Sequence, residues 1–180
     1  MKNIANLLFE ARLLKEIPRS GYHFLGVGKE SVAEHCFSTT FIAYVMSRIE
    51  PEIDALRLIS MCLIHDLPEA RIGDLNTVHK KYVTANETKA LEDTINGLAF
   101  GQNLTDLFDE FKDGRSREAK LAHDADQLAL IVELKDLIDI GYEPPRTWIQ
   151  NLKSRLKTKT GKKIAAAVME TNRDEWWIDI

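Results

Sequence analysis

The sequence predicts an all-α fold, a single compact bundle of helices. Apolar residues recur at helical spacing along almost all of the 180 residues. No stretch shows the sustained alternation and hairpin turns of β-strands. Helix start signals, in which a serine or threonine precedes a glutamate by three residues, occur at Ser31 and Thr84. We therefore expect one domain over residues 1–180, with a functional core at about 30–140 and C-terminal helices at about 145–180.

The composition is that of an ordinary soluble globular protein, with 44% hydrophobic and 29% charged residues. The formal net charge of −4 argues against stable nucleic-acid binding. No run approaches the ~20 apolar residues that a membrane span requires. The apolar rhythm of residues 4–14 is interrupted by Glu10 and Arg12, so it indicates an amphipathic helix and not a signal peptide. We expect a cytoplasmic protein with no membrane partner.

One predicted helix begins at Ser31 and ends before Pro51. Ser31 and Glu34 form a capping box, which places His35 in the first turns of this helix. The proline ends the helix because it cannot donate the next backbone hydrogen bond. We expect one apolar side, formed by Phe37, Phe41, Val45 and Met46.

A second helix runs from about Asp54 to the pair His65-Asp66. Its more uniformly apolar pattern predicts burial on nearly all sides, so we expect it to be the central helix. Pro68 should end or kink it just after Asp66, and Gly73 marks a further break. The apolar residues that carry this prediction are Leu56, Ile59, Cys62 and Leu63.

Further helices are predicted in the second half of the chain. Capping residues, glycines and a proline pair give their limits. They are a helix from Thr84 to Gly101 with a second capping box, a shorter one at 105–111, a long one from the Ser116 cap to Gly141, one around 148–156 after Pro144-Pro145, and a last one at 164–169.

Two histidines and two aspartates could close around one metal ion. His65 and Asp66 are adjacent, His35 lies upstream and Asp126 lies far downstream. Two imidazoles and two carboxylates form a mixed nitrogen and oxygen set that suits one borderline divalent cation, such as cobalt, manganese, iron or zinc. The two cysteines, Cys36 and Cys62, lie in apolar stretches and lack the paired spacing of structural zinc, so we expect buried free thiols.

The fourth ligand is ambiguous from periodicity alone, because Asp124 lies two residues before Asp126. With 100° between successive helical residues, these two aspartates flank the same apolar stripe on opposite sides. Helical spacing therefore does not choose between them. The stripe consists of Leu121, Ala125, Leu128 and Val132.

The ten residues from His65 to Asp74 read HDLPEARIGD, and they resemble the HDxxExxxGD signature of HD-domain metal-dependent phosphohydrolases. The small 5′-deoxynucleotidase branch carries an upstream arginine, a Glu-Ser-Val-x-x-His motif, this signature and a later aspartate. The chain has these elements in the same order, at Arg19, residues 30–35, residues 65–74 and Asp126. Four elements in order are much more specific than an HD pair alone, and they imply an all-α HD-domain bundle.

The resemblance implies that His35, His65, Asp66 and Asp126 bind the metal. The family places its last ligand in an Asp-Gln or Asp-Ala step of an apolar helix, which favours Asp126-Gln127 over Asp124. It also implies that Glu69 and Asp74 act around the attacking water and the substrate, and that Arg19 binds the substrate. One acid would handle the water and the other the leaving group, and either could fill either role. Lys80 follows the GD motif and could add positive charge near the phosphate, and we place Tyr22 at the substrate as well. The related pattern usually has Trp where this chain has Tyr22.

The implied reaction is hydrolysis of a 5′-nucleoside monophosphate, with preference for the 2′-deoxy sugar, to a nucleoside and phosphate. Two alternatives remain at this point. One is an HD-type phosphodiesterase or pyrophosphohydrolase for a cyclic nucleotide or an alarmone, and the other is a non-catalytic module that binds nucleotides or RNA. Family members are commonly homodimers, which is the reason to expect one here.

Two other groups of residues have simpler interpretations. The basic residues between positions 153 and 163 indicate a solvated helix end. The three tryptophans, Trp148, Trp176 and Trp177, should pack in the core or at a subunit interface.

Overall fold

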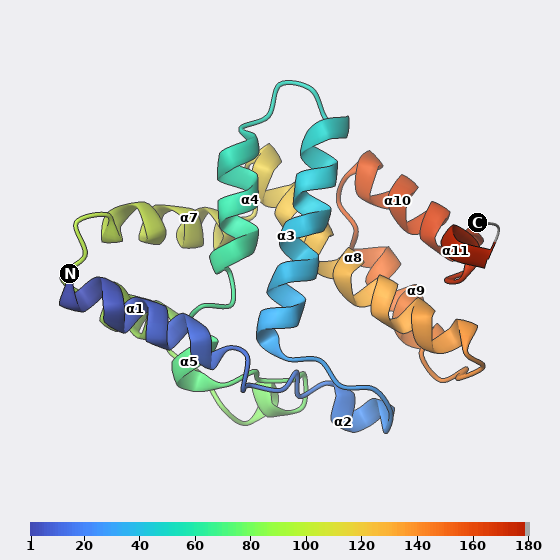
Figure 1. Ribbon diagram of the computed structural model, residues 1–180, viewed down its shortest axis with the longest axis horizontal. Coiled ribbons are helices and arrows are strands. Elements are labelled where there is room, and N and C mark those ends of the chain that lie inside the picture. Colours follow the sequence, from blue (N-terminus) through green and yellow to red (C-terminus); the bar gives the residue numbers. More distant parts are fainter. Residues whose placement is uncertain (179–180) are drawn as a thin grey trace.

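The computed structural model describes residues 1–178, and it confirms the all-α prediction. Within these residues no β-strand forms, and the only extended pairing is an isolated bridge between Pro18 and Ser31. Figure 1 shows α3 (Val32–Ile49) and α4 (Ala55–Ile64) side by side at the centre, with α8 (Arg117–Asp139) behind them. The functional side chains come from these three helices and the segments beside them.

The capping box at Ser31 is confirmed. The Ser31 hydroxyl accepts a hydrogen bond from the Glu34 amide at 3.2 Å, and the Glu34 carboxylate accepts one from the Ser31 amide at 2.6 Å. These two bonds fix the start of α3 and thereby the position of His35 in its second turn.

The predicted apolar side of α3 is largely wrong as a core face. Phe37 and Phe41 are 72% and 58% exposed, whereas Met46 is fully buried. Nine residues separate Phe37 from Met46, which places them on opposite sides of the helix, and helical spacing does not identify which side another helix covers. The buried face of α3 is instead formed by Val32, His35, Cys36, Thr39, Ala43, Met46 and Ser47.

The prediction that α4 is buried on nearly all sides is also wrong. Leu56 and Leu63 are 76% and 59% exposed, while Leu58, Met61 and Cys62 are fully buried. The central helix is α8, which packs against α3, α4 and α7 (Gly101–Asp113) on one side and against the C-terminal helices on the other. Its core residues are Leu121, Ala125, Leu128, Ile131 and Leu134, and the predicted stripe residue Val132 is 42% exposed.

The Thr84 capping box does not form. The helix α6 (Glu87–Ile95) begins after Asn86, whose side chain accepts from the Lys89 amide at 3.0 Å. Asparagine is as good an N-cap as threonine or better, so it takes the position closer to the helix. Gly101 begins α7 and does not end α6, so α7 starts four residues earlier than the predicted Thr105.

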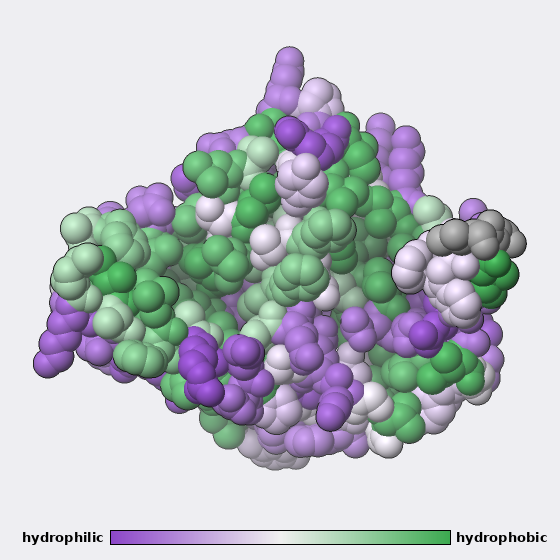
Figure 2. Space-filling view, viewed as in Figure 1, coloured by the Kyte–Doolittle hydropathy of each residue, from purple (hydrophilic) through white to green (hydrophobic). Residues whose placement is uncertain are grey.

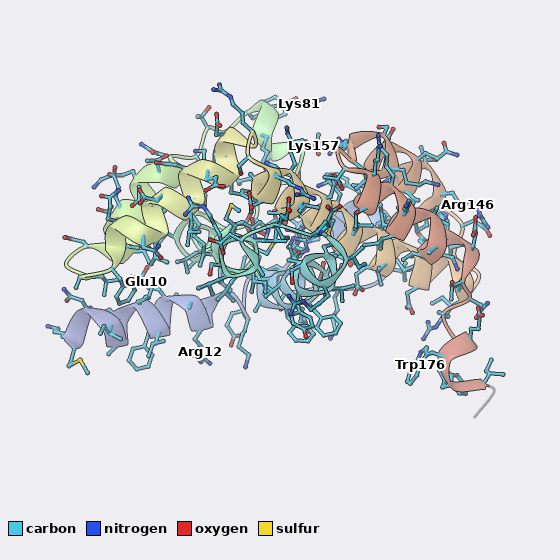
Figure 3. The ribbon with its side chains drawn as sticks, turned by 90° about the horizontal axis from the view of Figure 1, so that it is seen from above. Glu10, Arg12, Lys81, Arg146, Lys157 and Trp176 are labelled. Atoms are coloured by element: carbon cyan, nitrogen blue, oxygen red, sulfur yellow. The ribbon has the colours of Figure 1, made fainter. Side chains whose placement is uncertain are left out.

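The remaining helices surround the three central ones. At one end, α1 (Lys2–Leu13) packs near α5 (Glu69–Ile72) and α6. In Figure 3, Glu10 lies on the side of α1 that faces the other helices, where it pairs with Arg71 at 2.8 Å, and Arg12 lies on the opposite side. Two short elements lie in the connecting segments: α2 (Tyr22–Leu25) between α1 and α3, and a 3-10 turn (His79–Lys81) between α5 and α6.

At the other end, α9 (Arg146–Arg155) and α10 (Lys159–Glu170) pack on α8, and α11 (Glu175–Ile178) follows. The last long helix therefore begins five residues before the predicted Ile164, with Thr158 as its N-cap. Trp176 and Trp177 are 78% and 50% exposed, so neither packs in the core. Figure 3 shows Trp176 well apart from the bundle. Within residues 1–178, no helix has the length and apolarity that crossing a membrane would need.

Candidate metal centre and substrate cavity

His35 reaches the centre of the molecule from the second turn of α3. Its side chain is fully buried, and Nε2 lies 3.0 Å from Oδ1 of Asp126 on α8. The Thr39 hydroxyl, one helical turn later, lies 3.4 Å from the same nitrogen. A fully buried imidazole with a carboxylate at hydrogen-bonding distance is consistent with two roles: a structural core histidine or a metal ligand.

His65 distinguishes these two possibilities. Its Nδ1 lies 2.8 Å from the Cys62 carbonyl oxygen, which can only accept, so Nδ1 carries the proton. Nε2 is therefore the nitrogen that carries the lone pair in the neutral ring, and a metal ion would bind there in place of a proton. This atom is buried and has no hydrogen-bond partner among the described residues. A backbone carbonyl that fixes the tautomer of a histidine while the other nitrogen stays free is typical of metal-ligating imidazoles, so the site fits a metal ion.

The helix α4 ends at Ile64, and His65 and Asp66 are the next two residues. Asp66 Oδ2 lies 3.2 Å from His65 Nε2 and 3.8 Å from His35 Nε2. The two histidines and Asp126 offer donor atoms that all lie within 4.8 Å of one another. Nitrogen and oxygen donors at this spacing could hold one divalent ion, with Asp66 beside them.

The structure separates Asp124 from Asp126. Asp124 is fully buried and accepts hydrogen bonds from the backbone amides of Lys157 and Thr158 at 2.7 and 2.8 Å. The Thr158 hydroxyl also donates to it at 2.6 Å. Asp124 thus stabilises the start of α10 and faces away from the histidines, while Asp126 faces them.

The charges of the cluster shift its pKa values in opposite directions. Although burial alone would raise it, the pKa of Asp126 lies far below its usual range because His35 donates to it and both histidines are close. Burial alone would lower the pKa of His65, but the Asp66 carboxylate raises it to about 9. Asp66 also has a lowered pKa, since His65, His35 and Arg19 together outweigh its burial. The two carboxylates are therefore ionised at neutral pH.

Glu69 is the acid beside the cluster. It opens α5 one residue after Pro68. Burial, together with the charges of Asp66 and Asp74, raises its pKa to about 9. Its Oε2 is buried without a hydrogen-bond partner in the described chain. A carboxyl group with a strongly raised pKa next to ionised carboxylates is suited to carrying a proton during a reaction.

Asp74 has a different environment. Gly73 ends α5 with φ of 74°, a conformation that favours glycine, and the chain turns there into Asp74. Asp74 Oδ2 accepts from the Ser20 amide at 2.6 Å and lies 3.2 Å from the Ser20 hydroxyl. This carboxylate therefore holds the segment that carries the neighbouring Arg19.

Arg19 lies between two carboxylates. Its Nη1 is 3.3 Å from Asp66 Oδ2, and its Nε is 3.9 Å from Glu30 Oε2. Burial would lower its pKa, but the acids around it raise it, so the guanidinium stays charged. A fixed guanidinium beside the candidate metal ligands is well placed to meet a phosphate.

A cavity of about 530 Å³ opens beside this cluster. Of the nine residues predicted for the site, seven line it, and only the two buried histidines do not. The seven are Arg19, Tyr22, Asp66, Glu69, Asp74, Lys80 and Asp126.

Sequence reasoning missed the far wall of the cavity, which comes from α9. Trp148 packs against the core, as predicted, but it also lines the cavity together with Asn151. Arg155, predicted as part of a solvated helix end, is exposed and lines the cavity too. Their spacing at i, i+3 and i+7 places them on one helix face. This spacing is the sequence pattern from which a shared surface on the helix could have been predicted. Asn76, Thr77 and Gln127 complete the polar lining.

A model of the HD domain matches residues 11–168. The chain belongs to the HD domain family. The fold is accordingly an HD-domain helical bundle.

Relatives with 5′-deoxynucleotidase names match two thirds or more of this chain. The 5′-deoxynucleotidase HDDC2 of Dictyostelium discoideum is 32% identical over 135 residues, which cover 67% of this chain and 70% of the relative. The 5′-deoxynucleotidase HDDC2 of Homo sapiens is 25% identical over 177 residues, covering 87% of this chain and 86% of the relative.

Solved structures give the same fold. A conserved hypothetical protein from Pyrococcus furiosus has a TM-score of 0.78 at 29% identity, covering 93% of this chain and 99% of that chain. A predicted metal-dependent phosphohydrolase from Magnetospirillum magnetotacticum has a TM-score of 0.72 at 20% identity, covering 94% and 90%. At that lower identity the likeness establishes the fold alone.

Proposed function

We propose that this HD-domain protein is a metal-dependent 5′-deoxynucleotidase, which hydrolyses 2′-deoxyribonucleoside 5′-monophosphates to nucleosides and phosphate. The observation that carries the proposal is the donor cluster of His35, His65 and Asp126 beside a cavity lined by Arg19 and Glu69. The 5′-deoxynucleotidase names of the relatives support the substrate class.

His35, His65, Asp66 and Asp126 would hold one divalent ion, with cobalt, manganese, iron and zinc as candidates for a nitrogen and oxygen set. When bound, such an ion supplies Lewis acidity, which makes water a better nucleophile and offsets phosphate charge. The carbonyl of Cys62 and the capping box of α3 keep the two imidazoles oriented for this role.

In this proposal Glu69 manages the proton of the reaction, and Asp74 orders the loop that carries Arg19. Glu69 has the raised pKa and the buried, unpartnered oxygen within the described structure. Asp74 Oδ2 is already occupied by Ser20. Its other oxygen takes no part in those bonds, and Asp74 lines the cavity that the substrate would fill.

Arg19 would bind the phosphate, because its guanidinium lies 3.3 Å from Asp66 and lines the cavity. Lys80 adds a second positive charge to the lining. Tyr22 stands beside Arg19, and the α9 wall with Trp148 and Asn151 offers aromatic and amide groups to the sugar and base. The cavity volume of about 530 Å³ is in the usual range for a small-molecule site.

We also propose a cytoplasmic homodimer. The two free, buried cysteines suit a reducing compartment. On α3, the rings of Phe37 and Phe41 stack with centroids 6.3 Å apart, and Tyr44 continues the row at 6.4 Å. Figure 2 shows apolar surface across the middle of this face, over α3 and α4. A contiguous apolar surface of this kind marks an interaction site, and we assign a second copy of the chain to it.

The ligand assignment is tested by comparing His65→Ala and Asp126→Asn with Asp124→Asn. The first two substitutions should abolish stoichiometric binding of cobalt and 5′-deoxynucleotidase turnover. Asp124→Asn should keep both, because its carboxylate faces α10. Far-ultraviolet circular dichroism shows whether each variant is folded. Wild-type turnover in folded His65→Ala would refute the proposed centre.

A further inference from the structure

A second group of donor atoms overlaps the first at the proposed metal centre. Cys36, His65 and Asp66 each offer one ligand atom, and these three atoms lie within 4.8 Å of one another. His35, His65 and Asp126 form the other group at the same limit. Cys36 follows His35 directly in α3, so consecutive residues of one helix contribute to both groups.

The shared member, His65, is the reason to treat the second group as a ligand site. Its side chain is 3% exposed, and its buried Nε2 has no hydrogen-bond partner among residues 1–178. The bond to the Cys62 carbonyl already occupies Nδ1. A buried imidazole nitrogen that lies 3.2 Å from the Asp66 carboxylate is stabilised by a cation at that position, either a proton or a metal ion.

The two groups differ in chemical softness. The first offers two nitrogens and an oxygen, whereas the second replaces one imidazole by a sulfur. Thiolate ligands select zinc and other thiophilic ions, while carboxylate and water ligands suit magnesium and manganese. A buried thiol beside this centre therefore changes which ions the centre prefers.

We propose that Cys36 is an additional soft ligand of this metal centre: thiophilic divalent ions such as zinc, cadmium and cobalt, held by His35, His65, Asp66 and Asp126, also bind the Cys36 sulfur, which forms one donor group with His65 and Asp66. On binding, the thiol S–H bond breaks, its proton passes to solvent, and a sulfur–metal bond forms without a change of oxidation state. Asp66 lines the cavity, so an ion can reach the set from that side. The inference rests on the proposed metal centre.

Cys62 is a matched control. It is also a buried free cysteine, at 0% exposed against 5% for Cys36, and it lies in the helix that leads to His65. Its backbone carbonyl accepts from the histidine, and its sulfur belongs to neither donor group found in the described residues. Replacing either thiol by serine is a similarly small change, so the pair separates a ligand from a core thiol.

The test uses the full-length protein, stripped with a chelator and titrated with cobalt. The wild type and Cys62→Ser should show a thiolate-to-cobalt charge-transfer band in the near ultraviolet, and Cys36→Ser should lack it. X-ray absorption of the zinc-loaded wild type should show a sulfur neighbour at about 2.3 Å. Zinc-over-manganese preference, measured by competition, should fall about tenfold or more in Cys36→Ser, which amounts to at least about 1.4 kcal/mol.

The outcomes separate the two proposals. If the wild type binds cobalt stoichiometrically without a sulfur band, and zinc shows only nitrogen and oxygen neighbours, the role of Cys36 is refuted while the metal centre stands. If the wild type binds no ion at this site, the metal centre itself fails. The X-ray measurement needs no variant, so misfolding of Cys36→Ser would not leave the inference undecided.

Discussion

Glu30 illustrates how much a single side chain adds to this site beyond the proposed ligands. Its side chain is 4% exposed, and both carboxylate oxygens lack a hydrogen-bond partner within the described structure. Arg19 Nε lies 3.9 Å away, and the Arg19 amide donates to the Glu30 carbonyl at 2.8 Å. Glu30 and Asp66 therefore approach different nitrogens of the same guanidinium. In the sequence, Glu30 is identified only as the first residue of the Glu-Ser-Val-x-x-His motif.

The pKa of Glu30 predicts a pH dependence of stability. Burial raises it from 4.5 to about 7. The folded state therefore holds this proton more tightly than the unfolded state, and the free energy of unfolding falls as pH rises from about 4.5 to 7. Glu30→Gln cannot ionise, so it should gain up to roughly 3 kcal/mol relative to wild type across that window. Urea unfolding at pH 4.5 and 8 measures the difference.

The exposed Glu92 on α6 provides the control for that measurement. Glu92→Gln should follow the wild-type pH dependence. A Glu30→Gln protein whose stability relative to wild type is the same at both pH values would contradict the assignment of a raised pKa to Glu30.

Glu69→Gln tests the proposed proton carrier. The amide keeps the size of the side chain but cannot exchange a proton, so kcat should fall by about 10² to 10⁴-fold. Metal content should remain at the wild-type level, because Glu69 is outside the proposed ligand set. Steady-state kinetics together with metal analysis measures both, with Glu92→Gln unchanged in each. Near-wild-type kcat in the variant would remove Glu69 from the chemistry.

At the scale of helices, the sequence predicts where some helices begin but not where others do. Ser31, Asp54 and Ser116 each cap the predicted helix, because each stands directly before a run of apolar periodicity. Thr84 and Asn86 compete two residues apart, and the residue nearer the helix takes the role. The start of α10 could not be predicted, because Thr158 is held there by Asp124 from a distant helix.

Asp124→Ala tests this long-range cap. It leaves two backbone amides and the Thr158 hydroxyl without their acceptor, so the free energy of unfolding should fall by about 2 kcal/mol or more. Cobalt stoichiometry of the folded fraction should not change, because the side chain points away from the histidines. Denaturant titration and metal analysis give the two values. Loss of bound metal in a folded Asp124→Ala protein would mean that Asp124, and not Asp126, belongs to the centre.

At the scale of the whole molecule, the all-α class and the position of the site followed from periodicity and from ordered motifs. The identity of the central helix and the covered face of α3 did not. Phe41 and Met46 lie about 140° apart around α3, and one is 58% exposed while the other is fully buried, so apolar residues on two sides of one helix have different fates. Which face is covered depends on helices distant in sequence, here α8 against α3. The α9 wall of the cavity was missed for the same reason.

The exposed aromatic row of α3 predicts the state of association. Phe41→Asp places a charge in the middle of this row, so it should shift a dimer to monomers, because burying an unpaired carboxylate is costly. Light scattering coupled to size-exclusion chromatography measures the mass. Trp176→Asp, on the exposed α11, should leave the mass unchanged. A monomeric wild type would refute the homodimer, and a dimeric Phe41→Asp protein would place its interface elsewhere.

The most direct test of the central claim is phosphate release by chelated protein resupplied separately with cobalt, manganese, magnesium or zinc. The substrates are deoxyribonucleoside and ribonucleoside 5′-monophosphates, 3′-monophosphates and a phosphodiester. The account predicts metal-dependent release from 5′-monophosphates, faster for the deoxy sugar, with no release from the 3′-isomers and no cleavage of the diester. Cleavage confined to the diester, release that does not depend on metal, or no release from any 5′-monophosphate would contradict it.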